Sequence, residues 1–206
     1  MIHADSTPIV TEVTGPIAIV RFNRPEQRNP LSLETLQELK RITSALFSSN
    51  DVQTVIFTGT DDVFASGANI RELAQLDAGA AFQFSEFGQD LFQTIADARQ
   101  VTIAAINGYC MGGGLDFALA CDIRVASTSA VFSHPGARLG IITGWGGTQR
   151  LPRLIGRARA LEFFATARRY SSAAALEMGL ISRVGDPAVK CALECAHTVE
   201  AVASLS

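Results

Sequence analysis

The stretch GYCMGGGLDFALACDIR, from Gly108 to Arg124, places three consecutive glycines before an acidic residue and an apolar helical pattern. A β-rich run, VTIAAIN, precedes it, and its end leads into another, CDIRVAS. Glycine weakens regular structure because it loses more backbone entropy on folding than any other residue. The order strand, glycine turn, helix and strand predicts an α/β protein with largely parallel later strands.

Neither of two well-known glycine motifs explains the glycines. The spacing does not fit the dinucleotide-binding G-x-G-x-x-G pattern, and no Gly-Lys-Ser/Thr of a phosphate-binding P-loop is present. A helix N-terminus, however, offers unpaired N–H groups and a partial positive charge that an anionic oxygen can approach closely over glycine. A second small-residue loop, ASGAN at 65–69, precedes another short helix and can supply a second donor. Two donors aimed at one oxygen form an oxyanion hole.

The flanking sequence predicts further elements in the same alternating order. A hairpin is expected around Thr14-Gly15-Pro16, and Ser32 is expected to cap an amphipathic helix. Other predicted helices cover 78–98, 171–179 and 187–204, and a helix from 145 to 168 is expected to break at Pro152 and Gly156. No linker divides the chain. We therefore expect a single domain over 1–206, with a core at about 8–184 and a C-terminal helix at about 187–204.

Composition excludes several classes of protein. A net charge of −3 over 206 residues argues against a protein that binds nucleic acids or membranes by electrostatic attraction. The four cysteines form no CxxC pair and no metal-ligand set, which indicates reduced, buried thiols and no metal. No secretory signal and no membrane-length apolar run is visible, so we expect a cytoplasmic protein.

Four segments together resemble the successive signatures of the crotonase superfamily, the enoyl-CoA hydratase/isomerase family of acyl-CoA enzymes. In chain order they are NRPEQRNPLS, VFASGANIREL, INGYCMGGGLDFALACDIRVAS and GWGGTQRLPRLIGRARALE. The resemblance runs from about Pro8 to Val184 and implies a spiral of stacked ββα units. It also implies an acyl-CoA thioester as substrate, with coenzyme A as part of the substrate and no separate cofactor.

The resemblance assigns roles to particular residues. The backbone N–H groups of Ala68 and Gly113 are expected to hold the thioester oxygen, and Asp116 is expected to be the acid/base. The remaining substrate-binding positions that it implies are Asn69, Ile70 and Arg71 beside the thioester and CoA, Gly136 near the reacting carbons, and Glu26, Gln27 and Arg28 at the nucleotide end. Arg24, Arg28 and Arg71 are candidate partners for the CoA phosphates.

The sequence departs from the family pattern at the catalytic acids. Hydratases of the family use two glutamates to position water; Asp116 stands at the first position and Gly136 at the second. His134, two residues before Gly136, is an alternative proton carrier, although a buried structural histidine is the simpler interpretation. One carboxylate favours a proton shift or a decarboxylation over the addition of water. A silent acyl-CoA-binding homologue is the alternative function.

The C-terminal segment bears on assembly. Family members generally continue past GLISRV into several helices that build trimers or hexamers, whereas here one helix at 187–204 closes the sequence. The resemblance implies a homo-oligomer, and the short C-terminal segment argues against the usual one.

Overall fold

The computed structural model describes residues 7–203, and its largest element is a six-stranded sheet in the order β1-β2-β4-β7-β9-β12. Its strands are Ile9–Thr14, Ile17–Phe22, Thr54–Thr58, Val101–Ile106, Ile123–Ala126 and Arg183–Val184. The first pair is the antiparallel hairpin predicted around Gly15, and the other neighbours are parallel. The α/β class with mainly parallel later strands is therefore confirmed.

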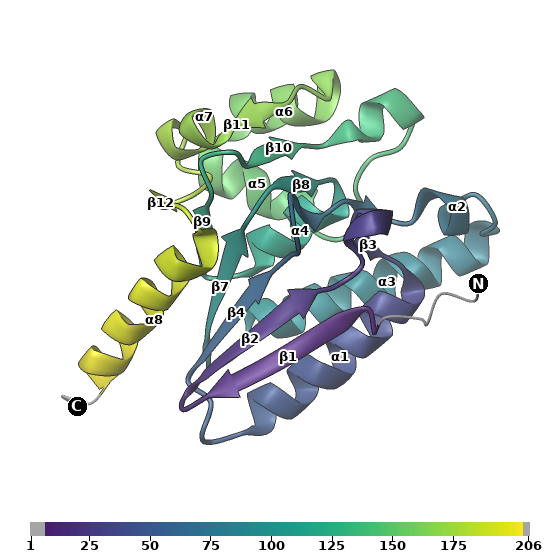
Figure 1. Ribbon diagram of the computed structural model, residues 1–206. Coiled ribbons are helices and arrows are strands. Elements are labelled where there is room, and N and C mark those ends of the chain that lie inside the picture. Colours follow the sequence, from purple (N-terminus) through teal and green to yellow (C-terminus); the bar gives the residue numbers. More distant parts are fainter. Residues whose placement is uncertain (1–6, 204–206) are drawn as a thin grey trace.

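Short strands build a second layer beside the large sheet (Figure 1). Four of them pair in the order β11-β10-β8-β5: Tyr170–Ser171, Val131–Ser133, Tyr109–Met111 and Val63–Ala65. Two more form a separate pair, β3 (Pro30–Leu31) and β6 (Gly67–Ala68). Because each long strand is followed by a short strand and then a helix, the chain winds through repeated ββα turns, as the family resemblance implies.

The helices cover both faces of the large sheet (Figure 1). Their bounds are α1 Leu33–Ser48, α2 Ile70–Leu73, α3 Ala78–Ala96, α4 Gly113–Ala120, α5 Gly147–Ile155, α6 Arg157–Thr166, α7 Ser172–Glu177 and α8 Ala188–Ala203, with short 3-10 helices at Pro25–Gln27 and Pro135–Leu139. Ser32 caps α1 through a hydrogen bond from the Thr35 N–H, as its sequence predicts.

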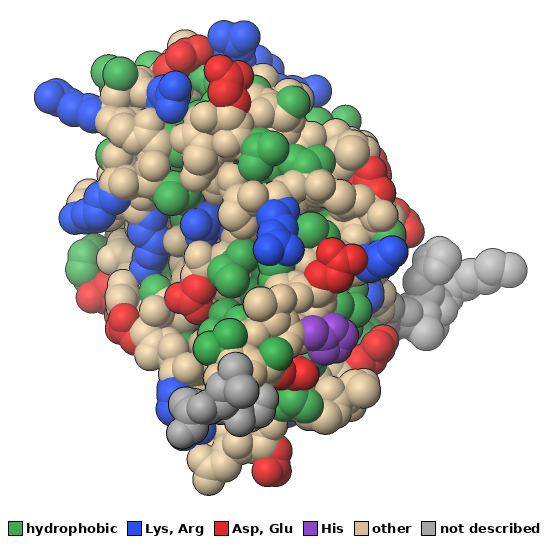
Figure 2. Space-filling model, turned by 90° about the vertical axis from the view of Figure 1, so that its left-hand side faces the viewer, with side chains coloured by type: hydrophobic (Ala, Val, Ile, Leu, Met, Phe, Trp, Pro, Cys, Tyr) green, Lys and Arg blue, Asp and Glu red, His purple; other side chains and the backbone are tan. Residues whose placement is uncertain are grey.

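Alternation along the strands sends side chains into two separate apolar layers. In β4, Val55 and Phe57 face the main core with α1, α3 and α4, whereas Ile56 faces a smaller cluster under α8. Figure 2 views the molecule from the α8 side, where acidic and basic side chains are interspersed over the surface. The main core lies next to the glycine-rich loops, and the α8 cluster lies on the far side of the sheet from them.

One predicted helix break is wrong in part. The segment 145–168 breaks at Gly156 alone, which has φ +84° and separates α5 from α6. Pro152 lies inside α5. The left-handed conformation at Gly156 ends the first helix, because only glycine adopts it without strain.

Candidate functional site

A pocket of about 650 Å³ lies between the N-terminus of α4, the α2–α3 segment and the loop 134–145. Its wall is mostly apolar and includes Ile70, Phe84, Ile142 and Trp145. Both predicted oxyanion residues, Ala68 and Gly113, line it. The structure therefore brings the two glycine-containing loops together at one cavity that is large enough for a small organic molecule.

Each of the three glycines at the start of α4 is required for a different structural reason. Gly112 has φ +52°, a conformation that disfavours other residues, and it turns the chain into the helix. Gly114 packs so closely on the Ala65 carbonyl that a Cβ would overlap it. Gly113 faces the pocket: a Cβ there would lie 2.5 Å from the Trp145 ring and 3.4 Å from the Ala68 nitrogen. Its bare backbone keeps the space beside Ala68 open.

The backbone of the second loop adjoins the first. Gly67 has φ +93°, and a Cβ on it would lie 2.8 Å from the Gly113 nitrogen. As the first residue of α4, Gly113 has an N–H without an intrahelical acceptor. The N–H groups of Ala68 and Gly113 thus belong to adjoining backbone segments at the pocket wall.

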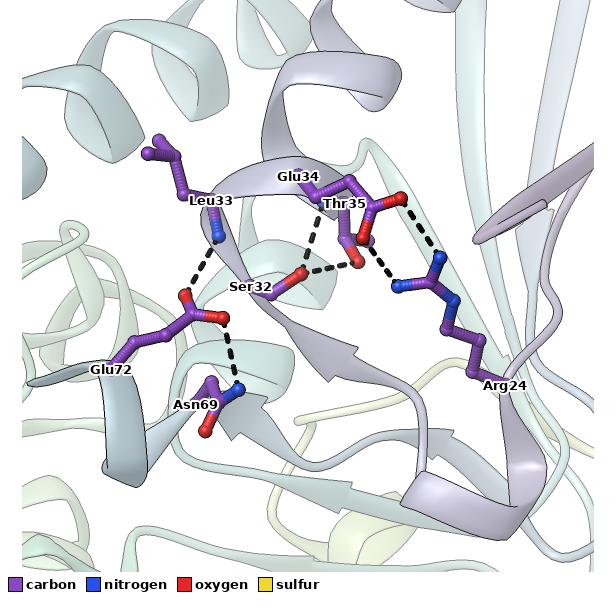
Figure 3. Close-up of polar contacts among 7 residues, drawn as sticks. All are labelled: Arg24, Ser32, Leu33, Glu34, Thr35, Asn69 and Glu72. Atoms are coloured by element: carbon purple, nitrogen blue, oxygen red, sulfur yellow. Dashed lines mark hydrogen bonds and ion pairs between the residues drawn. The ribbon is translucent and has the colours of Figure 1, made fainter. Parts of the chain in front are cut away.

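A chain of hydrogen bonds ties the Ala68 loop to α1 (Figure 3). The Asn69 side chain caps α2 by accepting from the Arg71 N–H, and it donates to Glu72. Glu72 in turn accepts from the Leu33 N–H. Asn69 was expected to contact the thioester; the structure places its side chain in this loop-fixing network.

Asp116 lies directly beneath the pocket wall, with no exposed surface. Thr143 donates to its Oδ2, and its Oδ1 faces His134. Burial raises the pKa of Asp116 to about 7, against the opposing effects of Thr143, the Trp145 and Gly147 backbone N–H groups and the charge of Arg150. A carboxyl group with this pKa can exchange a proton near neutral pH.

His134 forms part of the pocket lining and is 3% exposed. Its Nε2 lies 3.3 Å from Asp116 Oδ1, and its ring packs 4.8 Å, centroid to centroid, from Phe164. Neither Nε2 nor Oδ1 has an aligned hydrogen-bond partner in the described part of the chain. Burial lowers the pKa of His134 to about 4, so the free imidazole is neutral at pH 7.

Gly136 lies in the pocket lining, where the second carboxylate of a hydratase is expected from the resemblance. A Cβ on Gly136 would lie 2.5 Å from the Ile141 carbonyl oxygen. The loop backbone therefore occupies the space that a side chain at position 136 would need. A glutamate there requires a backbone shift.

Trp145 is 4% exposed and both lines the pocket and packs against the rings of Phe84 and Phe92. Thr143, whose hydroxyl holds Asp116, was not predicted as a site residue. The position of Thr143 matches a catalytic aspartate in one branch of the resembled superfamily, and this was the available signal.

A second, smaller pocket of about 250 Å³ adjoins the first, because Ser66 and Pro135 line both. Three arginines line it: Arg28, Arg138 and Arg169. Arg28 also lies over the Tyr109 ring, at 5.2 Å. The sequence predicts Arg28 as a phosphate partner, and Arg169 belongs to the arginine cluster at 150–169, which the sequence leaves open as a basic face for a phosphorylated small molecule.

Four other residues that were predicted to contact the CoA part of the substrate lie outside both pocket linings. Glu26, Gln27 and Arg71 are exposed at the surface. Arg24 forms a two-pronged ion pair with Glu34, at 2.6 and 2.9 Å (Figure 3). Its guanidinium therefore has an acidic partner already.

Within residues 7–203, no helix is long and apolar enough to cross a membrane. The same residues contain no group of three or more His, Cys, Asp or Glu side chains that could hold a metal ion.

Comparison with curated proteins identifies close relatives. Short-chain-enoyl-CoA hydratase of Clostridium acetobutylicum is 36% identical over 180 residues, which cover 87% of this chain and 69% of the relative. Crotonyl-CoA hydratase of Syntrophomonas wolfei is 38% identical with the same coverage. The chain thus spans about two thirds of the length of these relatives.

Solved structures agree with this relationship. Pseudomonas aeruginosa DspI matches with a TM-score of 0.90 and 34% identity, over 95% of this chain and 81% of that one. Enoyl-CoA hydratase from Bacillus anthracis matches with a TM-score of 0.89 and 36% identity, over 94% and 76%. The family profile described as enoyl-CoA hydratase/isomerase matches residues 12–204. The chain therefore belongs to the enoyl-CoA hydratase/isomerase family of the crotonase superfamily.

Proposed function

We propose that this enzyme binds an acyl-CoA thioester in the large pocket and stabilises its enolate between the N–H groups of Ala68 and Gly113. The observation that carries the proposal is the meeting of these two loops at one apolar pocket, directly above a single buried carboxylate. A proton next to a thioester is acidic enough for a carboxylate-based site only if the enolate oxygen is stabilised. One such donor contributes about 3 kcal/mol to the transition state.

The reaction that the site supports best is a proton shift along the acyl chain. Asp116 is the one acidic side chain at the pocket floor among the described residues, and the Gly136 position is closed by the Ile141 carbonyl. Isomerisation of a double bond, or a decarboxylation, needs one proton carrier, whereas syn addition of water uses two positioned acids. The names of the relatives specify hydration, so hydratase activity is the comparison that any assay must include.

The arginine-lined pocket is our candidate for the CoA phosphates. It shares the lining residues Ser66 and Pro135 with the large pocket, and Arg28, Arg138 and Arg169 have no acidic partner among the described contacts. Guanidinium groups bind phosphate in a two-pronged manner. Coenzyme A enters as part of the substrate, and the absence of a separate cofactor, the oligomeric state and the cytoplasmic location stay predictions of the sequence.

Calorimetric titration tests this function. We expect butyryl-CoA to bind at least about tenfold more tightly than butyrate, because the free acid lacks the phosphates and the neutral thioester oxygen. Equal affinities would refute the assignment of the pocket.

Turnover separates the enzyme from its alternative, a silent acyl-CoA-binding homologue, which the closed Gly136 position favours. Purified protein is assayed for isomerisation of 3-hexenoyl-CoA and for hydration of crotonyl-CoA. The proposal expects isomerisation to exceed hydration. Tight binding with neither activity would identify a silent binder.

A further inference from the structure

Two polar atoms face each other beneath the pocket without a hydrogen bond. They are His134 Nε2 and Asp116 Oδ1, 3.3 Å apart and both fully enclosed. A buried polar atom without a partner lowers the stability of the folded state, because it has lost its hydrogen bonds to water. Native proteins keep few such atoms, and a pair at one cavity points to a functional arrangement that tightens during reaction.

The two residues differ in their access to the cavity. His134 contributes to the pocket lining, whereas Asp116 does not and has no exposed surface. Thr143 donates to Oδ2 of the Asp116 carboxylate, and the backbone N–H groups of Trp145 and Gly147 also favour its ionised form. Because Nε2 is the ring nitrogen that faces Asp116, we assign Nδ1 to the ligand.

We propose that His134 carries the proton to and from the acyl chain and that Asp116 acts through it, as a positioning residue that orients the ring and stabilises the imidazolium. This inference rests on the proposed function, because it needs an enolate formed at Ala68 and Gly113. It transfers the acid/base role from Asp116, the first choice from the sequence, to His134, the alternative proton carrier that the sequence indicated.

The steps balance without any further reactant. A C–H bond next to the thioester breaks, its proton passes to Nδ1 of neutral His134, and the electron pair moves onto the thioester oxygen. The ionised Asp116 carboxylate then accepts a hydrogen bond from Nε2–H and offsets the positive charge that burial disfavours. Return of the same proton to a different carbon completes the isomerisation and restores the neutral imidazole.

The surroundings of the pair contain few other charges. Arg150, from α5, lies near enough to favour the ionised form of Asp116, and Cys110, from β8, is a buried thiol whose pKa is raised, first by burial and then by the charge of Asp116. The His134 ring also packs against the apolar ring of Phe164. Proton transfer at this site is therefore governed by the two residues themselves.

The experiment measures loss of the α-protons of butyryl-CoA in D₂O by NMR, for wild type, His134→Gln and Asp116→Asn. The matched control is His197→Gln, an exposed histidine on α8. Removal of the proton carrier is expected to slow exchange by on the order of 100-fold or more, with butyryl-CoA affinity unchanged. Wild-type exchange should increase with pH through about 7, the pKa of Asp116, and this dependence should disappear in Asp116→Asn.

Two results are kept distinct. No exchange by the wild type at any pH refutes the proposed function. Exchange by His134→Gln at the wild-type rate, while Asp116→Asn is slow, overturns the inference about His134 alone and returns the role to Asp116.

A measurement on the wild type covers the case in which His134→Gln does not fold. At pH 8, nitrogen-15 NMR of the histidines should show His134 as the neutral tautomer protonated at Nε2. A proton on Nδ1 would contradict the proposal.

Discussion

At the scale of single residues, Asp116 and His134 have opposite effects on stability. Burial raises the pKa of Asp116 from 3.8 to about 7, so the folded state binds the extra proton and stability decreases as pH rises through this window. Burial lowers the pKa of His134 from 6.5 to about 4, so stability increases as pH rises between those values. Folding thus moves one proton from the histidine to the aspartate, and the two effects nearly cancel between about pH 4 and 6.5.

Single variants should reveal the pH dependence of the unfolding free energy that cancels in the wild type. Relative to wild type, Asp116→Asn should become more stable as pH rises from about 4 to 7, by at most about 4 kcal/mol over the window. His134→Gln should show the opposite trend between about pH 4 and 6.5. Thermal unfolding at closely spaced pH values checks both, and parallel curves for all three proteins would mean that neither group is perturbed.

Gly113→Val should abolish turnover while the protein still folds. The Cβ of the new valine would overlap the Trp145 ring, and its side chain would occupy the space beside the Ala68 nitrogen. The expected loss is on the order of 100-fold or more in kcat/KM, as for one disabled oxyanion donor. Unchanged kinetics with a native circular dichroism spectrum would place the oxyanion hole elsewhere.

The sequence was sufficient to name the segments that form the candidate site, but not to predict how deeply their side chains are buried. A spacing of three residues from Gly113 puts Asp116 in the first turn of α4, where its side chain is fully buried. Its burial beneath Thr143 and its contact with His134 depend on how the loop 134–145 folds back over the helix. That loop has no periodic pattern, so its contacts are a product of tertiary packing.

At the scale of elements, one glycine of α3 sets how closely that helix packs on Trp145 at the site. A Cβ on Gly88 would overlap the indole of Trp145, which also borders Gly113. Gly88→Ala should therefore displace the indole, reduce Tm and reduce activity together, although alanine is the better helix former by about 1 kcal/mol.

Gly79→Ala is the matched control in the same helix, because its Cβ would make only an ordinary contact, 3.5 Å from Asp77 Oδ1. This substitution should keep activity and leave Tm equal or higher. Differential scanning calorimetry and the exchange assay on both variants test the contact. Equal behaviour of the two variants would show that α3 does not position Trp145.

Elements with strong local signals were predicted well. The hairpin around Gly15 and the Ser32 cap of α1 follow from turn and capping chemistry within a few residues. The short strands β8 and β10, of three residues each, were not predicted, since so few residues show no alternation. They exist because neighbouring chain segments supply their hydrogen bonds.

At the scale of the whole molecule, α8 closes an apolar layer that is separate from the site. Small side chains, with Ala192 and Ala196 fully buried, let the helix lie close to Ile56 and Ile103 of the sheet. The apolar layer under α8 and the pocket therefore lie on opposite faces of one sheet.

Ala192→Asp should separate the stability of the protein from its activity. It buries a carboxylate without a partner and should cost about 3 kcal/mol or more, which lowers Tm by about 6–12 °C in a protein of this size. At a temperature where the variant is still folded, its rate of α-proton exchange should equal that of wild type. His197→Asp, on the exposed side of α8, is the control and should change Tm little. A lower exchange rate in folded Ala192→Asp would show that packing under α8 affects the catalytic site.

The position of Trp145 makes its fluorescence a probe of ligand binding. It is the single tryptophan of the chain, and it is enclosed between Phe84 and Phe92 at the pocket wall. Tryptophan fluorescence, excited at a wavelength that tyrosine does not absorb, therefore originates from one place, next to the bare backbone of Gly113. Emission near the blue end of the tryptophan range is the expected signature of this enclosed indole. Arrival of an acyl chain changes the surroundings of that indole directly, so unlabelled protein can report occupancy of its pocket in a stopped-flow cuvette.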